Sequence, residues 1–408
     1  MKLRPAALLM HRYVGLAMAA FLTVSGLTGS IIAFNHELDE WLNPSLFERL
    51  SDAPPLPATE IIAEIERQDP NIYVSFFEFE EEPDHNAVAF VQPRPDPETG
   101  EAVEPGYNQI FADPATGRIA GKREWGALRV DAAHLLPFLY KLHYSLHIPG
   151  VWGLFFMGIV AIFWTVDCLV GFYLTLPGGR PFWRKWAPAW KLKRGAAPHR
   201  RNLDLHRAGG LWLWPVLFVV ALSGVALNLP DHVFKPVVGF FAELTPDLRD
   251  LAAERLNAKY DEPPQIGYPE ALALAQRAAA ERGIMEPASM LWYPKDYAAI
   301  GVGFGDPHGT GLGASWVFFD DRTGELLHVQ IPGTGTAADT FVQLQFPLHS
   351  GQIIGLPGRI LISLTGLVVA VLSVTGVLIW ARKRKSARAA KALRAPDAEP
   401  HRHAAPAE

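Results

Sequence analysis

The sequence is almost free of cysteine, and this scarcity excludes several kinds of redox protein. Its 408 residues include one cysteine, Cys168, which excludes a disulfide framework and a thiolate-bound metal cluster. No CxxCH motif for covalent haem is present, and flavin and nicotinamide motifs are missing too. The runs Gly301-x-Gly303-x-Gly305 and Gly309-x-Gly311-x-Gly313 have no strand before them and no helix after them, which predicts a β-turn or loop.

Long apolar runs are present at residues 10–34, 151–176, 211–229 and 353–380. Each run can cross a bilayer at about 1.5 Å per residue. Hydrophobic residues make up 49% of the chain, which is high for a soluble protein and low for a pure membrane bundle. The first run follows Lys2 and Arg4, but it is longer than a signal-peptide core and lacks a small-residue cleavage site. We therefore expect a retained helix there.

Charge is segregated along the chain, although the net charge is only −5. The loop after the second apolar run and the tail after Trp380 are basic, whereas residues 37–140 are acidic. Because short basic segments stay on the cytoplasmic side of a membrane, we expect both termini and the central loop inside. The two long segments, about 35–140 and 230–347, are then expected outside.

Both long segments have the pattern of small α+β domains. A helical pattern at 57–68 precedes alternating runs and the turn Asp113–Gly117 in the first segment. A helical pattern at 268–282 precedes a strand-like run and the turn Asp320–Gly324 in the second. The strand-like runs are 72–79, 87–92, 108–112 and 315–319. Each segment is predicted to fold as one helix on a short antiparallel sheet.

The same motifs occur twice in the chain. His11-Arg12-x-x-Gly15-Leu16 matches His206-Arg207-x-x-Gly210-Leu211, and Leu27-Thr28-Gly29 matches Leu222-Ser223-Gly224. The two turns also match, as do Leu142-His143 with Leu348-His349 and Gly171 with Gly376. This repeat indicates a duplicated unit of helix, outer domain and helix. Because each copy contains two spans, the copies are parallel. The predicted fold is a membrane all-α four-helix bundle with two outer α+β domains and an internal parallel duplication.

Four histidines lie at matched positions of this bundle. His11 and His206 fall at the cytoplasmic ends of the first and third spans, and His143 and His349 at the outer ends of the second and fourth. Pseudosymmetry brings each pair face to face, and two neutral imidazoles in an apolar site suit the axial positions of a b-type haem. We therefore expect two haem b groups, one near each membrane face. A single histidine at an interface is more often a polar anchor or a helix cap, but four matched positions favour ligation.

Residues near these histidines fit the same interpretation. Arg12, Arg207 and Arg359 can neutralise haem propionates. Glycines in the spans leave room for a flat macrocycle or for close helix contact; they are Gly15, Gly26, Gly29, Gly210 and Gly224. Asp167, within the second span, can act as a proton or hydrogen-bond partner.

The remaining histidines have other predicted roles. His147 follows His143 by four residues on the same predicted face, so it is either an alternative ligand or a surface contact near substrate. His36 and His232 lie one position out of register at the outer ends of spans and are either caps or part of an external metal site. Solvated positions are predicted for His199, His401 and His403, and ordinary surface positions of the outer domains for His85, His134, His308 and His328.

Together these residues resemble a known family. The His-Arg-x-x-Gly-Leu motif with a following Thr-Gly, the Asp-x-x-Thr-Gly turn, and Leu142-His143-x-Ser145-Leu146 before a glycine-rich span are similar to the PepSY-associated transmembrane proteins over residues 8–382. Members include iron-regulated bacterial inner-membrane proteins, among them dihaem ferric-siderophore reductases. The resemblance implies four spans, periplasmic PepSY domains and haem ligation by His11, His206, His143 and His349.

The resulting hypothesis is a transmembrane oxidoreductase that carries electrons outward across the inner membrane. The chain lacks the flavin/nicotinamide reductase domain of some relatives, so its electron donor is expected to be a separate cytoplasmic partner. The resemblance suggests a ferric siderophore as the periplasmic acceptor, since reduction to Fe(II) weakens binding by hard oxygen ligands. The lipid bilayer is a further expected partner, and no nucleic acid is expected.

Two other hypotheses remain open. In the first, the PepSY domains of a non-enzymatic membrane protein regulate or assemble a periplasmic partner, and the histidines are interfacial anchors. In the second, the histidines are transit sites of a metal-ion transporter, for which carboxylates beyond Asp167 would be expected within the spans. The expected domain bounds are 8–34, 141–176, 205–229 and 348–381 for the spans, 35–140 and 230–347 for the periplasmic domains, 177–204 for the cytoplasmic loop, and 382–408 for a basic, disordered tail.

Overall fold

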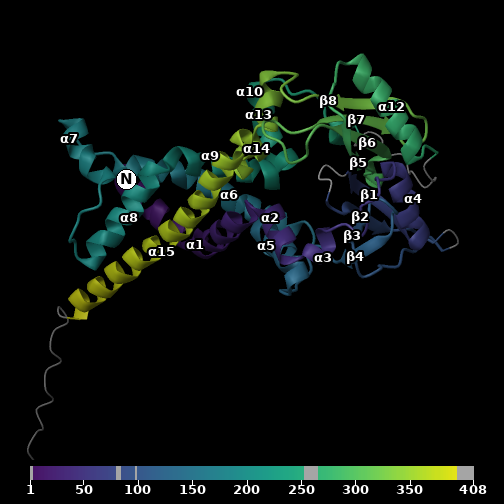
Figure 1. Ribbon diagram of the computed structural model, residues 1–408. Helices are drawn as coiled ribbons and strands as arrows, with labels where there is room; N and C mark the ends of the chain where they lie inside the picture. Colours follow the sequence, from purple (N-terminus) through teal and green to yellow (C-terminus); the bar gives the residue numbers. More distant parts are fainter. Residues whose placement is uncertain (1–2, 80–83, 97–98, 252–264, 393–408) are drawn as a thin grey trace, which may run out of the picture. The chain divides into compact units, whose positions relative to one another are not determined.

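The computed structural model describes residues 3–79, 84–96, 99–251 and 265–392 (Figure 1). Contacts within the chain define two compact units. The first, called here the helical unit, comprises the residues up to 23, residues 166–217 and the residues from 368 onward. The second, called here the sheet unit, comprises residues 24–165 and 218–367.

Among the described residues, three helices are long and apolar enough to cross a membrane: α1 (Leu3–Ile32), α6 (Trp152–Thr175) and α15 (Leu356–Ala392). They correspond to the first, second and fourth apolar runs. The third run is broken, because α8 (Pro198–Trp212) and α9 (Trp214–Asn228) meet at a bend of 72° and reach span length only as a pair. Pro215 explains the break, since it lacks an N–H group and its ring clashes with the preceding helical turn.

Helix α15 continues past the predicted end of the fourth span. The tail expected to be disordered over 382–408 is helical as far as Ala392. Alanine, lysine and arginine are strong helix formers, and this stretch contains neither glycine nor proline. Residues 393–408, which include His401 and His403, lie outside the described residues.

The two predicted outer domains share one sheet. Its eight strands are antiparallel in the order β4-β3-β2-β1-β5-β6-β7-β8. The strands are β1 (Ile72–Glu78), β2 (Ala87–Pro93), β3 (Gln109–Ala112), β4 (Ile119–Arg123), β5 (Ala288–Trp292), β6 (Ala299–Phe304), β7 (Ser315–Asp320) and β8 (Leu326–Gln330). The halves join where β1 pairs with β5, with Phe77 opposite Leu291. The two halves therefore form one continuous sheet. Without the other half, β1 and β5 would each be an edge strand with unpaired backbone groups, and their pairing removes both open edges.

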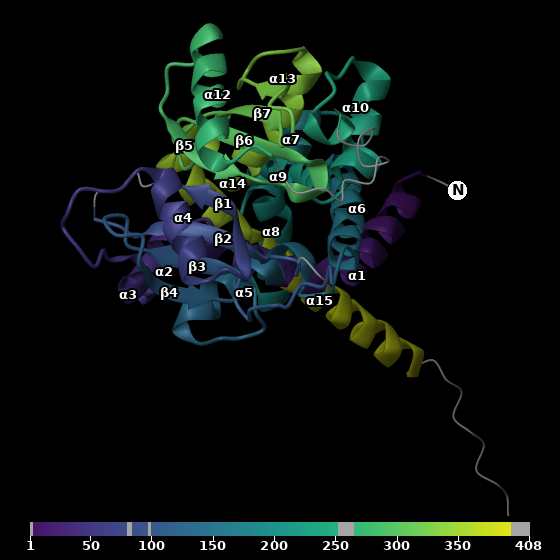
Figure 2. The same ribbon diagram turned by 90° about the vertical axis from the view of Figure 1, so that its right-hand side faces the viewer.

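Helices α4 (Ala58–Gln68) and α12 (Tyr268–Glu281) cover the same face of this sheet, as Figures 1 and 2 show. Helix α4 buries Ile62 and Ile65 over the first half, and α12 buries Ala271 and Ala275 over the second. Tyr73, on a strand of the first half, belongs to the core under α12. The apolar core is thus shared across the junction as well.

Strand β6 contains two glycines that were expected in a turn. A Cβ atom at Gly301 would collide with the ring of Phe318, and one at Gly303 would lie 2.8 Å from Met290. The prediction of a β-turn or loop is therefore wrong for Gly301 and Gly303, which lie within a strand. Side chains of the neighbouring strands occupy the space beside these glycines, where a larger residue would not fit. Residues 309–313 lie between β6 and β7 without helix or strand structure, as predicted.

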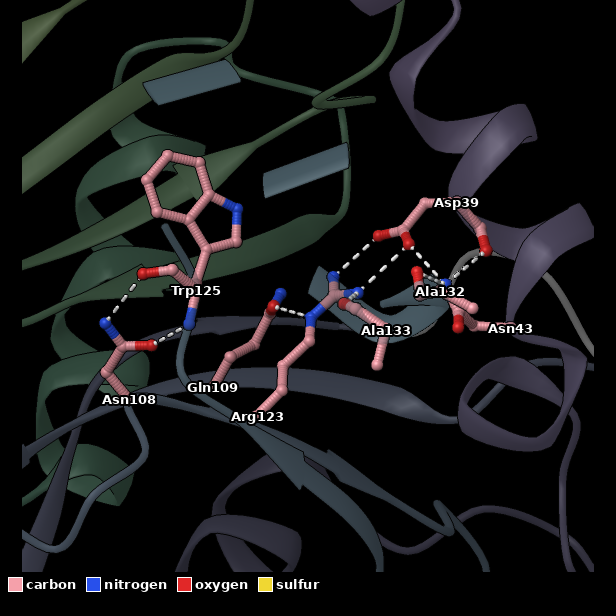
Figure 3. A network of polar contacts seen from close by, with 8 residues as sticks. All are labelled: Asp39, Asn43, Asn108, Gln109, Arg123, Trp125, Ala132 and Ala133. Carbon is pink, nitrogen blue, oxygen red and sulfur yellow. Dashed lines mark hydrogen bonds and ion pairs between the residues drawn. The ribbon is translucent and has the colours of Figure 1, made fainter. Parts of the chain in front are cut away.

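A buried ion pair fixes helix α2 (Asn35–Leu42) to the sheet (Figure 3). Arg123 on β4 donates to the Asp39 carboxylate at 2.6 and 3.0 Å, and both side chains are buried. The same network includes Gln109, Asn43, Ala132 and Ala133. Because helix α5 (Ala132–Ser145) begins at two of these residues, the network also holds the helix that carries His143.

Short helices complete the described chain. They are α3 (Pro44–Phe47), α7 (Phe182–Trp186), η1 (Ala187–Trp190), η2 (Pro230–Phe234), α10 (Lys235–Phe241), η3 (Lys295–Tyr297), α13 (Ala337–Gln343), α14 (Gln345–Ser350) and η4 (Gln352–Ile354).

Candidate functional site

In the helical unit, His11 on α1 and His206 on α8 face each other. Their ring centres are 6.0 Å apart, and the ring planes are inclined by 55°. Nδ1 of His11 lies 2.9 and 3.0 Å from the carboxylate oxygens of Asp167 on α6. Nδ1 of His206 lies 2.9 Å from the carbonyl oxygen of Leu372 on α15. Since an ionised carboxylate and a carbonyl only accept hydrogen bonds, Nδ1 carries the hydrogen in both rings and Nε2 keeps its lone pair.

A glycine of α6 and a glycine of α15 lie next to these rings. A Cβ atom at Gly171 would lie 3.5 Å from Cε1 of His11, and one at Gly376 would lie 3.3 Å from Cε1 of His206. In the sequence, these two glycines stand out only as a matching pair of the repeat, with no contact to a histidine predicted. In the structure, each stands four residues after the residue that binds Nδ1 of its histidine.

In the sheet unit, His143 on α5 and His349 on α14 face each other in the same way. Their ring centres are 6.1 Å apart at an interplanar angle of 68°. Nδ1 of His143 lies 3.0 Å from the carbonyl oxygen of Ser25. Nδ1 of His349 lies 2.9 Å from the hydroxyl of Ser223, which donates its own hydrogen to the Val219 carbonyl. Both rings therefore donate through Nδ1 and leave Nε2 as the free nitrogen.

The repeated Leu-Thr-Gly and Leu-Ser-Gly motifs supply partners that were not predicted from the sequence. The hydroxyl of Thr28 lies 3.2 Å from Nδ1 of His143. In the same way, the hydroxyl of Ser223 lies 2.9 Å from Nδ1 of His349. A Cβ atom at Gly29 would lie 2.9 Å from Cε1 of His143. A hydroxyl residue at the same place in both copies was the available signal for this role.

Burial lowers the pKa of both histidines in the sheet unit, which lie on α5 and α14 and precede the helices that are long enough to cross a membrane, α6 and α15. The pKa of His143 is below its usual value, and that of His349 falls to about 4 because the neighbouring His143 adds to the effect of burial. Burial therefore favours the neutral form of both imidazoles, which is the form that binds a metal ion.

The geometry of both pairs fits two imidazoles on opposite sides of one iron. Metal–imidazole bonds of about 2 Å on each side place the ring centres roughly 6 Å apart, which agrees with both measured separations. Within the part of the chain that the structure describes, no hydrogen bond engages Nε2 of these histidines. No group of three or more His, Cys, Asp or Glu side chains among those residues is placed to hold a metal ion. The residues support axial ligation by two histidines, as in a b-type haem.

The three arginines expected near haem propionates have different surroundings. Arg207 pairs with the buried carboxylate of Asp204 at 3.1 Å, and Arg359 pairs with Glu37 at 2.6 Å. Arg12 makes no hydrogen bond or ion pair with another described residue. Arg12 is therefore the arginine best able to pair with a new anion.

His147 does not share a helix face with His143. Helix α5 ends before it, and Leu146 and His147 both have left-handed backbone conformations, with φ of 53° and 56°. Nε2 of His147 lies 2.9 Å from the carbonyl oxygen of Phe138. The ring of His147 also stacks on the ring of Phe138. The prediction of a shared face is therefore wrong, because the helix ends in a left-handed cap before its next turn. His147 instead lines a cavity of about 450 Å³.

His36 and His232, the candidates for an external metal site, lie in different surroundings. His36 stacks on His308 at 5.2 Å and lies 6.3 Å from His85, whereas His232 packs against Phe155. The partners of His85 and His308 are the carboxylates of Glu40 and Glu78, each at 3.0 Å. Nothing in the sequence groups His36, His85 and His308, because they come from distant segments.

His134 is buried, with 9% of its surface exposed, although it was expected on the surface. Its Nδ1 lies 2.6 Å from the carboxylate of Asp131, three residues earlier, and this pairing compensates its burial. His199 is exposed as expected, and His328 is half-buried.

A comparison with protein families gives a match that covers most of the chain. The family described as the PepSY-associated TM region matches residues 8–383. The chain belongs to this family. No curated protein matches it. The PepSY-associated TM match confirms the resemblance drawn from the sequence and makes the chain a membrane protein, and it includes both histidine pairs.

Proposed function

We propose that this PepSY-associated TM protein is a membrane electron carrier that holds two b-type haems and reduces an acceptor outside the cytoplasm. The observation that carries the proposal is the arrangement of His11, His206, His143 and His349 in two facing pairs, each ring held through Nδ1. Metal-binding histidines have their second nitrogen fixed in this way, which sets the tautomer and the orientation of the ring.

The protein's own residues have distinct tasks at each site. With haem bound, the two Nε2 atoms of each pair would bind the iron and Arg12 would pair with a propionate at the His11/His206 site, while the Nδ1 acceptors hold the rings. When bound, a b-type haem supplies a one-electron carrier whose potential depends on axial ligands, hydrogen bonds and burial. The glycines at 29 and 376 leave room for the rings of His143 and His206, because a Cβ atom there would lie 2.9 and 3.3 Å from them.

The membrane arrangement that we propose follows the distribution of charge. Four spans, the third formed by α8 and α9 together, cross a bacterial inner membrane with both termini in the cytoplasm and the sheet in the periplasm. We also propose that the chain arose by parallel duplication. The equivalent contacts of Gly171 and Gly376, and of Thr28 and Ser223, support this origin.

The proposed acceptor is a ferric siderophore, and the proposed donor is a separate cytoplasmic reductant. The choice of acceptor follows the family resemblance and the chemistry of iron, since Fe(II) binds hard oxygen ligands less tightly than Fe(III). Electrons would enter at the His11/His206 site and leave at the His143/His349 site.

Single-ligand variants test the assignment. We expect His206→Ala and His349→Ala each to lower the haem content of the purified protein from two per chain to one, measured as the pyridine haemochrome. His147→Ala is the matched control and should keep both haems, because Nε2 of His147 is already bonded to Phe138. Retention of both haems in the two ligand variants would contradict the proposal. A colourless protein despite ample haem would instead favour a regulatory or assembly role.

A further inference from the structure

Asp167 has a different kind of residue as its counterpart in the second half of the chain. The glycines that contact the ligand rings, Gly171 and Gly376, set the register between α6 and α15. Asp167 stands four residues before the first glycine, and Leu372 stands four residues before the second. Both positions bind Nδ1 of a histidine, but one uses a side-chain carboxylate and the other a backbone carbonyl. A negative charge therefore holds His11, whereas a neutral group holds His206.

The carboxylate of Asp167 is not needed merely to orient a ring. The carbonyl oxygen of Leu372 achieves the same bond at 2.9 Å without any charge. Asp167 is buried, with 8% of its surface exposed, and a carboxylate inside a membrane helix is costly. Within the described residues it accepts a hydrogen bond from His11 and forms no ion pair with a lysine or arginine. The charge itself is the feature that requires an explanation.

We propose that Asp167 makes the His11/His206 site the lower-potential of the two haem sites, a role that rests on the proposed function. A carboxylate that accepts a hydrogen bond from Nδ1 makes Nε2 of the same ring a stronger donor to iron. Its negative charge also stabilises the more highly charged ferric state, and this attraction is strong where little water screens it. Both effects act in the same direction and lower the reduction potential.

The other site lacks such a charge. His143 is held by the carbonyl of Ser25 and the hydroxyl of Thr28, and His349 by the hydroxyl of Ser223. No described carboxylate forms an ion pair with a ring nitrogen of either histidine. The asymmetry therefore favours electron movement from the His11/His206 site to the His143/His349 site, which is the direction of the proposed function.

The test is a spectroelectrochemical titration of purified variants that keep one site. In the His349→Ala background, which keeps the His11/His206 site, Asp167→Asn removes the charge but keeps an oxygen that accepts from Nδ1. We expect its reduction equilibrium constant to rise roughly tenfold or more, equal to about 59 mV for a tenfold change in a one-electron couple. Thr375→Val is the matched control. It removes a neutral hydroxyl 3.2 Å from Nδ1 of His206 and keeps the carbonyl bond, so the potential should stay close to that of the parent.

Each outcome bears on one proposal. An unchanged potential in Asp167→Asn, with haem bound, would overturn the role of Asp167 and leave the proposed function intact. An equal shift in the His206→Ala background, which keeps the other site, would also overturn it. If Asp167→Asn fails to bind haem, the two single-site parents decide, since the His11/His206 site must have the lower potential. Absence of haem from the wild-type protein would overturn the proposed function itself.

Discussion

At the scale of single residues, the two sites depend on which ring nitrogen of each histidine carries the hydrogen. Asp167, Leu372, Ser25 and Ser223 determine this, because each presents an acceptor to Nδ1. The same four bonds fix the orientation of the rings and leave Nε2 of each histidine without a hydrogen bond among the described residues. In the proposed haem sites, the histidines would bind the iron, and other residues fix the orientation of their rings.

Ser223→Ala removes the hydroxyl that accepts from Nδ1 of His349. We expect haem affinity at the His143/His349 site to fall roughly tenfold, because a ligand ring without its outer partner is less well oriented. The affinity is measured by titrating haem into the apo-protein and following the Soret band. Thr365→Val is the control, since the hydroxyl of Thr365 is also buried but bonds only within α15. Equal losses in both variants would contradict a specific role for Ser223.

The pairing of the four histidines could be predicted from the sequence, whereas most of their hydrogen-bond partners could not. The repeat singled out His11, His206, His143 and His349 because they fall at matching positions of matching motifs. Backbone acceptors carry no side-chain signal, so no reading of the sequence points to the carbonyls of Ser25 or Leu372. Asp167 was visible as a carboxylate within a span, but its partner became evident only from the packing of α6 against α1.

At the scale of elements, hydrophobic periodicity was informative where one face of an element is buried. Helices α4 and α12 and strands β1, β2, β3 and β7 are confirmed close to their predicted bounds. Strand β6 was missed because it is buried on both faces and contains Gly301 and Gly303, so it shows no alternation. The broken third span was readable in principle from Pro215.

Asp39→Ala breaks the buried ion pair that connects α2 and α5 to the sheet. The guanidinium of Arg123 would remain buried without its carboxylate, so we expect a loss of about 3–5 kcal/mol in the free energy of unfolding. Chemical denaturation followed by tryptophan fluorescence measures this loss. Glu64→Ala, which removes the exposed pair of Glu64 with Arg67, is the control and should leave the denaturation midpoint unchanged. A similar midpoint for both variants would contradict the role of the buried pair.

Asp339 gives α13 a stability that depends on pH. Burial acts to raise the pKa of Asp339, but the hydrogen bonds that it accepts from Thr245 and Thr336 outweigh burial and lower it. A carboxyl whose pKa is lower in the folded state stabilises that state above its unfolded pKa of about 3.9, and this contribution is lost as pH falls through the folded value.

Asp339→Asn should therefore lower the free energy of unfolding by about 1 kcal/mol at pH 7, the usual size of a capping interaction at a helix N-terminus, because Asp339 completes a capping box with the N-cap Thr336. The difference from wild type should disappear as the pH falls below the folded pKa. Denaturation curves of both proteins between pH 7 and strongly acidic pH measure it. A difference that persists at the acid end would show that the charge of Asp339 is not responsible.

At the scale of the whole molecule, the pairing of β1 with β5 unites the two outer segments. Each segment alone predicts its own small sheet, because hydrophobic alternation reports which face of a strand is buried but not which edge is paired. In the structure β1 of the first segment pairs antiparallel with β5 of the second, in the middle of the sheet. This pairing involves both segments, so neither segment alone could predict it.

The most direct measurement is the visible absorption spectrum of the detergent-purified protein, oxidised and dithionite-reduced, with haem quantified per chain. We predict two b-type haems per chain with the low-spin bands of two axial imidazoles, because the ring centres of the two histidine pairs are 6.0 and 6.1 Å apart. A protein that contains no haem after expression with ample haem supply would contradict the central claim.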